Sequence, residues 1–326
     1  MNLFNKLLKT INYKLVNWQM SKRHTVVFGK PYMLVLDTTN LCNLECVWCP
    51  TGQKRNTRTP ATMPKEKVFN IVDRFGLYLK EFLLFNWGEP FLNKDIIEII
   101  SYAKKKSKAY LVISSNMNIK LSYEDACKLI DGGLDKFIAS IDGVSQKSYE
   151  MYRKKGNAEI AFDNLKTLVK AKKEKKSQTP EIVWQYLVFK HNEHEIENAK
   201  QIADEIGVDR IEFTKPWCPT QWASTIEKYS NYVAHKTDKE YKRKDDYCNW
   251  LWNAVVINSN GSVSPCCSVE NEKEDFGNIF GQSFFKLYNN KDFRVARQYN
   301  KNRKDGGHKN RCTVCEHIGT CNHTCN

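Results

Sequence analysis

The chain has 326 residues, 41% of them hydrophobic and 12% aromatic, which is enough for one large domain with a sizeable core and a smaller domain. It carries 51 Lys and Arg against 37 Asp and Glu, a formal net charge of +14. The absence of a long uncharged apolar run argues against a membrane-spanning helix, and the first residues lack the apolar core of a signal peptide. We therefore expect a cytoplasmic protein whose 12 cysteines stay reduced and bind metal.

Residues 1–30 predict one amphipathic helix and a connector. Apolar side chains recur on one face at helical spacing, and three lysines (Lys6, Lys9 and Lys14) lie off that stripe. The stripe consists of Leu3, Phe4, Leu7, Leu8, Ile11, Leu15 and Trp18. Such a helix could make peripheral contact with a membrane. Packing of its apolar face onto the protein's own domain is commoner, and we expect that outcome.

Residues 31–220 alternate short apolar runs with helical patterns. The runs predict six strands, at 32–37, 81–86, 109–114, 136–140, 181–189 and 210–213. Strands that are each followed by helical or loop material form repeated β–α units and hence a parallel sheet. The fold class is α/β, and this pattern alone suits an open doubly wound sheet and a barrel equally well.

Residues 221–326 lose this rhythm. Seven of the 12 cysteines lie from Cys248 onward, and the stretch 254–267 predicts a hairpin that turns at Asn260 and Gly261. A segment so poor in apolar periodicity is expected to depend on metal for its fold. The predicted boundary between the two domains lies within 215–245.

Three cysteines directly follow the first strand. Cys42, Cys46 and Cys49 have the spacing C-x3-C-x2-C, whereas a closed metal site normally takes four ligands. Three thiolates can hold three irons of a [4Fe–4S] cube and leave the fourth iron open. A zinc site completed by a distant cysteine is the alternative.

The stretch CNLECVWCP, Cys42 to Pro50, resembles the cluster loop of radical S-adenosylmethionine (SAM) enzymes, including the aromatic Trp48 before the last cysteine. The resemblance implies that SAM chelates the open iron through its amino and carboxylate groups. It implies that one-electron reduction, by a donor such as flavodoxin or ferredoxin, cleaves SAM to a 5′-deoxyadenosyl radical that abstracts hydrogen. It also implies a partial (β/α)6 TIM-like barrel.

Three further stretches at successive strand ends resemble motifs of the same family. NWGEP resembles its GGEP motif, SSN resembles its STNG motif with Met117 in place of glycine, and SIDG leads to YEMYR. Active-site residues of parallel barrels come from the C-terminal ends of strands. The resemblance thus implies eight SAM-binding residues: Trp48, Gly88, Glu89, Pro90, Ser115, Asn116, Ser140 and Arg153.

The later cysteines resemble the SPASM/twitch extension of radical SAM enzymes, which carries auxiliary [4Fe–4S] clusters. The shorter twitch pattern, C-x17-C followed by C-x2-C, implies one auxiliary cluster ligated by Cys248, Cys266, Cys312 and Cys315. The other cysteines, Cys267, Cys321 and Cys325, are then spare or bind a second cluster. The full SPASM pattern has a seventh cysteine that this sequence lacks, so we expect one auxiliary cluster. A zinc site is again the alternative.

Cys218 lies beyond the sixth strand and belongs to neither cysteine pattern. A thiol there could return a hydrogen atom to a substrate radical, as in radical epimerases of the superfamily. The alternative is a small loop residue packed against Trp217.

The expected reaction is hydrogen abstraction from a small polar substrate (a sugar, aminocyclitol or nucleotide-linked metabolite), which leads to oxidation or epimerisation. Thirty residues before the barrel leave no room for a leader-binding domain, so maturation of a peptide or protein is the second choice. The lysine-rich segments suggest a third class, an iron–sulfur or zinc scaffold that binds nucleic acid. No nucleic-acid-binding signature accompanies the charge.

Overall fold

The computed structural model describes residues 3–230 and 248–315. The predicted ligands Cys321 and Cys325 lie outside the described residues.

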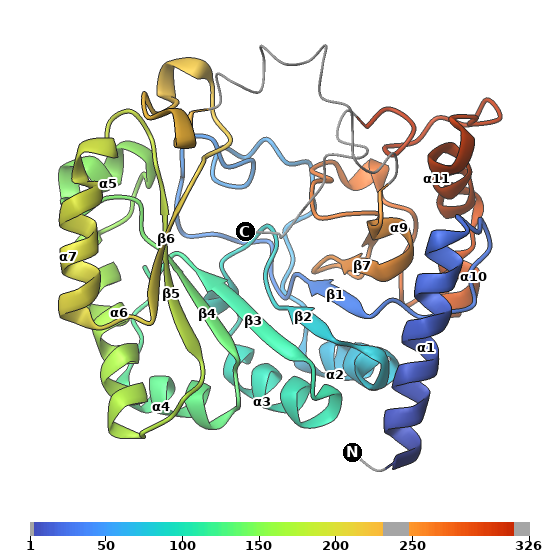
Figure 1. Ribbon diagram of the computed structural model, residues 1–326, viewed down its shortest axis with the longest axis horizontal. Coiled ribbons are helices and arrows are strands. Elements are labelled where there is room, and N and C mark those ends of the chain that lie inside the picture. The colour runs from blue at the N-terminus through green and yellow to red at the C-terminus, as the bar shows by residue number, and fades with distance from the viewer. Residues whose placement is uncertain (1–2, 231–247, 316–326) are drawn as a thin grey trace.

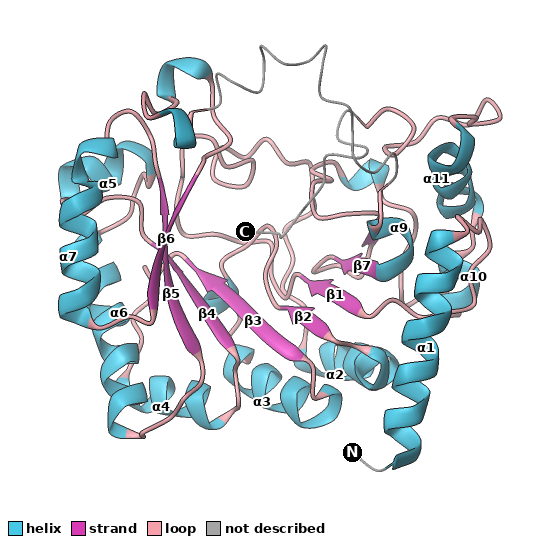
Figure 2. Ribbon diagram, viewed as in Figure 1, coloured by secondary structure: helices cyan, strands magenta, loops and turns pink. Residues whose placement is uncertain are grey.

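One curved sheet organises the described part of the chain (Figure 1, Figure 2). Its strands follow the order β6-β5-β4-β3-β2-β1-β7-β8, and every neighbouring pair is parallel except β7 and β8. The strands are β1 (Met33–Leu36), β2 (Glu81–Leu83), β3 (Tyr110–Ser115), β4 (Lys136–Ser140), β5 (Glu181–Leu187), β6 (Arg210–Thr214), β7 (Ala254–Ile257) and β8 (Val263–Ser264). The first six strands confirm the predicted partial (β/α)6 barrel.

Helices cover the outer side of this sheet (Figure 2). The α-helices are α1 (Leu3–Ser21), α2 (Lys65–Phe75), α3 (Ile96–Ser107), α4 (Tyr123–Asp131), α5 (Gln146–Tyr152), α6 (Ala158–Glu174), α7 (Ile196–Ile206), α9 (Trp250–Asn253), α10 (Phe284–Tyr288) and α11 (Lys291–Asn302). The short 3-10 helices are η1 (Gly76–Tyr78), η2 (Pro90–Leu92), η3 (Glu193–Glu195), η4 (Thr220–Trp222), η5 (Glu227–Tyr229) and η6 (Glu272–Glu274). No helix in 3–230 or 248–315 is long and apolar enough to cross a membrane.

The two faces of the sheet have separate cores because successive side chains of a strand point to opposite sides. Leu34 and Leu36 belong to the large core beneath the outer helices. Val35 belongs to a smaller core on the inner face, together with Trp250 and Val256 from the C-terminal part of the chain. Apart from β6, the longer strands are largely buried on both faces, which explains why they appear in the sequence as continuous apolar runs.

The predicted C-terminal hairpin forms, and its first strand also extends the barrel sheet. Val256 and Ile257 of β7 pair antiparallel with β8, and Gly261 turns between the strands with φ +85°. On its other side β7 pairs in parallel with β1. Short apolar runs do not reveal such a long-range pairing. The domain boundary near residue 220 stays a prediction, since 231–247 lie outside the described residues.

Helix α1 corrects one expectation. Most of its apolar stripe does not pack onto the protein's own domain: Leu3 is 83% exposed, Leu7 55% and Ile11 52%, and only Leu8 and Leu15 are partly buried. The buried residues of the helix are instead Asn12, Val16 and Gln19. The sequence pattern located the helix but assigned the wrong face to the interior.

Candidate radical and auxiliary cluster sites

The loop after β1 holds the first three cysteines in a fixed turn. The amide of Cys49 donates to the carbonyl of Cys46 at 3.2 Å, and the amide of Val47 donates to the carbonyl of Tyr152 at 3.1 Å. A Cβ added to Gly52 would lie 2.6 Å from the backbone nitrogen of Cys46, so the chain folds back tightly onto the loop. Backbone contacts therefore brace the loop.

Burial dominates the chemistry of these thiols. It is the main cause that raises the pKa of Cys42 to about 11 and that of Cys46 to about 12, while Arg153 lowers both. A buried thiol that favours its protonated form becomes a thiolate when a cation replaces the proton. Cys42 and Cys46, with Cys49 in the same loop, fit an iron–sulfur cluster.

Gly88 lies where the loop after β2 crosses the loop after β1. A Cβ at this position would be 1.9 Å from the carbonyl oxygen of Thr39, so no other residue fits without moving the backbone. The amide of the next residue, Glu89, donates to the carbonyl of Leu41 at 2.8 Å. The GEP stretch is thus attached to the cysteine loop, and Pro90 begins η2 directly after it.

Glu89 joins the ends of β2 and β3. It is 2% exposed, and its carboxylate accepts from the hydroxyl of Ser115 at 2.9 Å and from the amide of Asn116 at 2.7 Å. Burial raises its pKa, and these hydrogen bonds lower it. The side chain of Asn116 in turn donates to Cys42 Sγ at 3.7 Å and to Asn43 Oδ1 at 2.9 Å. The GEP and SSN motifs therefore form one network with the first cysteine.

Ser140 lies on the inner face of the sheet. Its hydroxyl is 3.2 Å from that of Ser114 on β3 and donates to Gln185 Oε1 on β5 at 3.3 Å. This row of polar groups crosses three strands near their C-terminal ends. Sequence reasoning missed Gln185, although a glutamine within the apolar run EIVWQYL was an available signal.

Arg153 forms a buried ion pair that the sequence analysis also missed. Its Nε is 2.6 Å from Asp142 Oδ2, and the two side chains are 11% and 0% exposed. Asp142 Oδ1 accepts from the amide of Leu187 at 2.7 Å, which fixes the carboxylate. Asp142 is the aspartate of the SIDG stretch, so the motif was noticed but this residue was not assigned a role.

Asp37 is a second buried carboxyl that the sequence analysis did not assign. It follows β1, accepts from the amide of Gly88 at 3.4 Å, and its Oδ2 has no hydrogen-bond partner within the described residues. Burial raises its pKa to about 7. The aspartate that ends the apolar run YMLVLD was the available signal.

Cys218 and Trp48 are both partly buried against one small apolar cluster, whose buried members are Leu44, Cys46, Tyr152 and Phe189. The ring of Trp48 meets that of Trp222 edge to face, with centroids 5.5 Å apart. Trp217 is 82% exposed. Cys218 therefore packs against the same apolar cluster that contains Cys46.

The four predicted auxiliary ligands come from three separate segments. Cys248 precedes α9, Cys266 follows β8, and Cys312 and Cys315 follow α11. Burial is the main cause that raises the pKa of Cys248 to about 12 and that of Cys266 to about 11, and neighbouring thiols of the set raise both further. Burial and then Cys266 and Cys248 raise the pKa of Cys312. The fold therefore gathers these four thiols.

Within 3–230 and 248–315, no three Cys, His, Asp or Glu side chains form a group that could hold a single metal ion. Cys267 packs partly buried against the inner-face core.

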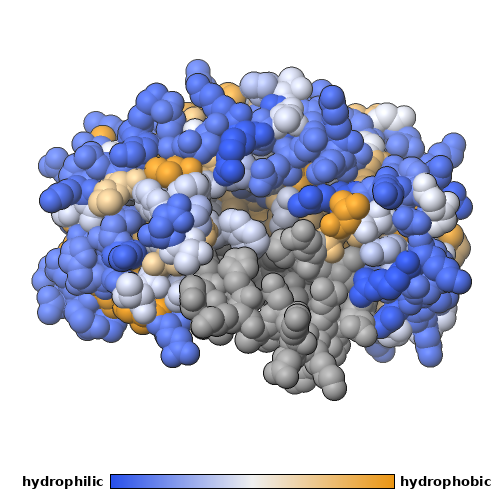
Figure 3. All heavy atoms as spheres, turned by 90° about the horizontal axis from the view of Figure 1, so that it is seen from above, coloured by the Kyte–Doolittle hydropathy of each residue, from blue (hydrophilic) through white to orange (hydrophobic). Residues whose placement is uncertain are grey.

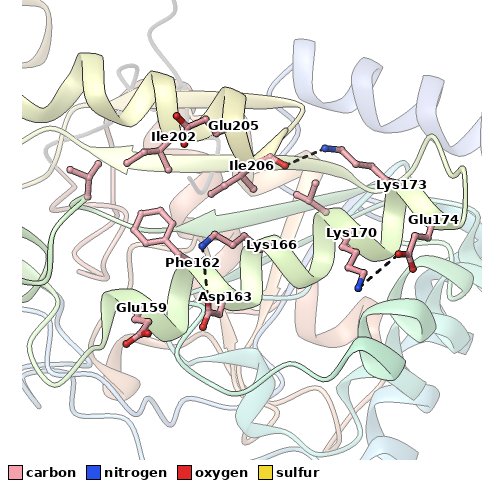
Figure 4. A pocket seen from close by; sticks show the side chains of 12 residues that line it. Glu159, Phe162, Asp163, Lys166, Lys170, Lys173, Glu174, Ile202, Glu205 and Ile206 are labelled. Atoms are coloured by element: carbon pink, nitrogen blue, oxygen red, sulfur yellow. Dashed lines mark hydrogen bonds and ion pairs between the residues drawn. The ribbon is translucent and has the colours of Figure 1, made fainter.

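A cavity of about 700 Å³ lies elsewhere, on the outer wall of the barrel (Figure 4). Side chains of α6 and α7 line it, among them Phe162 and Ile202, with lysines and carboxylates around the edge. None of the predicted site residues lines it. It is separate from the strand ends where the cysteine loop lies.

The chain belongs to the radical SAM superfamily, whose sequence model matches residues 36–203. An iron–sulfur cluster-binding domain, SPASM, matches residues 248–322. The protein therefore binds a [4Fe–4S] cluster and SAM in its barrel, and auxiliary iron–sulfur clusters in its C-terminal part.

Individual similar proteins differ in function. A probable GTP 3′,8-cyclase of Pyrococcus abyssi is 35% identical over 127 residues, which are 38% of this chain and 39% of that relative, so the chain spans well under half of its length. The PqqA peptide cyclase of Bradyrhizobium diazoefficiens is 23% identical over 89% of this chain and 80% of its own length. The crystal structure of Streptococcus suis SuiB bound to SAM has a TM-score of 0.61, with 15% identity over 85% of this chain and 69% of that one. This likeness establishes the fold alone.

Proposed function

We propose that the protein is a radical SAM enzyme that abstracts hydrogen from a small polar substrate held on the inner face of the barrel. Ser114 and Gln185 carry the proposal, because they flank the predicted SAM-binding residue Ser140 and offer hydroxyl and amide groups at the strand ends where the cluster loop lies. The described surface seen from above is also mainly hydrophilic (Figure 3). When bound, the [4Fe–4S] cluster and SAM supply a 5′-deoxyadenosyl radical, the species that removes the hydrogen.

The eight predicted residues would bind SAM in different ways. Gly88 lets the GEP loop approach the cysteine loop, and Glu89 holds Ser115 and Asn116 in place through its hydrogen bonds. Arg153, oriented by Asp142, keeps a buried positive charge near Cys46. We propose that this charge attracts the SAM carboxylate.

We propose that Cys218 returns a hydrogen atom to the substrate, which makes the net reaction an epimerisation. Its contact with the cluster around Cys46 and Trp48 supports this role. The step breaks the S–H bond and forms a C–H bond on the opposite face of the carbon. The thiyl radical that remains takes one electron from the external donor and one proton from solvent. If Cys218 has no such role, dehydrogenation is the remaining outcome.

Deuterium labelling separates these two outcomes. Cluster-loaded enzyme, SAM and dithionite are incubated without oxygen in D2O with a panel of sugars, aminocyclitols and nucleotide-linked sugars. An epimerase forms 5′-deoxyadenosine and places one solvent deuterium in the product, whereas a dehydrogenase gives an oxidised product without that label. Cys218→Ala should abolish the labelled product, and Cys127→Ala on α4 is the matched control. Unchanged product stereochemistry in Cys218→Ala would reject the donor role.

Peptide maturation is the second candidate. The similarity to the PqqA peptide cyclase extends over 89% of this chain and supports it. If peptides increase 5′-deoxyadenosine formation and the small-molecule panel does not, the peptide assignment replaces the first proposal.

A further inference from the structure

Helix α1 presents its apolar side chains to solvent. Phe4 is 64% exposed and Trp18 51%, and with Leu3, Leu7 and Ile11 they form an exposed stripe along the helix. Figure 1 shows α1 at the outer edge of the molecule. A contiguous exposed apolar surface of this kind marks an interaction site more often than an isolated exposed leucine does.

Polar clamps hold the opposite face of α1. The amide side chain of Asn12 exchanges two hydrogen bonds with the backbone of Lys30, both at 2.8 Å. Gln19 Oε1 accepts from the amides of Phe28 and Gly29 at 3.2 and 3.0 Å. These directional bonds fix the rotation of the helix about its axis.

Val16 adds a close fit to this buried face. A Cβ added to Gly29 would lie 2.6 Å from Val16 Cγ2, so the segment after α1 packs tightly beneath it. The outward direction of the apolar stripe is thus set by specific contacts on the other side of the helix. Rotation of the stripe toward the protein would break both amide clamps.

The charged side chains of residues 1–30 all have one sign. Residues 1–30 contain no Asp or Glu, whereas they contain Lys6, Lys9, Lys14, Lys22, Arg23 and Lys30. Lys6 and Lys14 are exposed beside the stripe. An amphipathic helix with lysines next to Leu, Phe and Trp is typical of helices that lie in a membrane interface, and anionic lipids add an attraction of about 1 kcal/mol per basic residue near the surface.

We propose that α1 docks the protein on an anionic lipid surface, with the apolar stripe at the boundary between headgroups and acyl chains. The 19 residues of α1 lie parallel to that surface and do not cross it. A second copy of the chain is a less favourable binding partner for the stripe. Two α1 helices that faced each other would bring lysines together without a carboxylate on either helix.

Vesicle flotation of the full, cluster-loaded protein tests this. Vesicles of phosphatidylcholine with about one third phosphatidylglycerol should bind the protein, and vesicles of phosphatidylcholine alone should bind it far less. Raising the salt should weaken the binding, because it screens the lysines. Leu7→Glu with Ile11→Glu should weaken binding to the anionic vesicles at least about tenfold, since both side chains leave the apolar phase.

The matched control changes two exposed apolar residues elsewhere. Met151→Glu with Ile160→Glu alters side chains that are 40% and 42% exposed and adds the same charge. This control should bind like the unaltered protein, and both variants should keep the unaltered melting temperature. Lys6→Gln with Lys14→Gln should remove much of the preference for anionic lipid and leave the apolar stripe intact.

Three results would overturn the proposal. The first is that the unaltered protein does not bind anionic vesicles. The second is that the double variant Leu7→Glu with Ile11→Glu binds these vesicles as well as the unaltered protein does. The third is a dimer, seen by light scattering, that the same double variant converts to monomer without a change in vesicle binding. That result would assign the stripe to a second copy.

Discussion

The two cysteine sites of this protein are built in opposite ways. Cys42, Cys46 and Cys49 occupy one loop, and backbone hydrogen bonds to the end of α5 brace that loop. Cys248 and Cys312 come from segments far apart in the chain, and only the tertiary fold brings them together. The first site therefore needs local geometry, and the second needs an intact C-terminal part.

A buried ion pair links the two regions. Arg58, in the segment after the first cysteine loop, lies 2.8 Å from Asp275, and their side chains are 2% and 4% exposed. Arg58 also donates to the carbonyl of Val269 at 2.7 Å and to the hydroxyl of Ser264 at 3.2 Å. This arginine ties the segment after the radical site to the segment that carries Cys266.

The largest effect is expected at the first site. Cys46→Ala should reduce 5′-deoxyadenosine formation below detection, because the cube needs all three thiolates, one on each iron that does not bind SAM. The protein should lose about four irons and keep its auxiliary absorbance. Cys127→Ala is the control and should keep both iron and activity. Retained SAM cleavage in Cys46→Ala would contradict the assignment.

At the second site, Cys312→Ala should have a structural effect. We expect loss of the auxiliary iron and destabilisation of the C-terminal part on the order of 5 kcal/mol, because metal binding there contributes to folding. SAM cleavage without substrate should persist, since the first loop is braced independently. Iron analysis, melting temperature and a 5′-deoxyadenosine assay measure the three quantities. Equal loss of SAM cleavage in Cys312→Ala and Cys46→Ala would contradict the claim that the first site is independent of the second.

Arg58→Met should destabilise the protein by about 3–5 kcal/mol, because it leaves the carboxylate of Asp275 buried without its partner. Lys65→Met is the matched control, since Lys65 makes its ion pair with Glu98 at the surface. It should change the melting temperature little. Similar melting temperatures for the two variants would show that the Arg58 pair does not join the regions.

The smallest expected effect is on the pH dependence of stability, and it comes from substitution of Asp37. Its folded pKa of about 7 exceeds the ordinary value of 3.8, so its stabilising contribution is complete below the ordinary value and is lost as the pH rises through 7. Asp37→Asn removes this dependence. Between pH 6 and 8 the unaltered protein should lose about 1 kcal/mol of stability relative to the variant. A constant difference in melting temperature across this range would contradict the raised pKa.

The sequence predicted those parts of the site that depend on one short segment. The cysteine loop and the GEP, SSN and SIDG stretches follow strands that apolar runs predict, and parallel strands place their ends at one rim. The structure connects these stretches through Glu89 and Asn116. Such local patterns can be recognised in the sequence without knowledge of the tertiary fold.

These missed features depend on contacts between different elements of the fold. The pairing of β7 with β1 joins residues more than two hundred positions apart, and the Arg153–Asp142 pair requires two different elements to meet. The buried face of α1 was predicted wrongly because hydrophobic periodicity does not register the amide clamps of Asn12 and Gln19. Periodicity identifies an apolar face, but it does not tell what covers that face.

The central claim is that SAM binds the open iron of the cluster held by Cys42, Cys46 and Cys49. Electron paramagnetic resonance of the dithionite-reduced Cys312→Ala protein, which keeps the first cluster, tests it most directly. We predict that addition of SAM shifts the g values of the reduced cluster, because its amino and carboxylate groups become iron ligands. An identical spectrum with and without SAM would contradict the account.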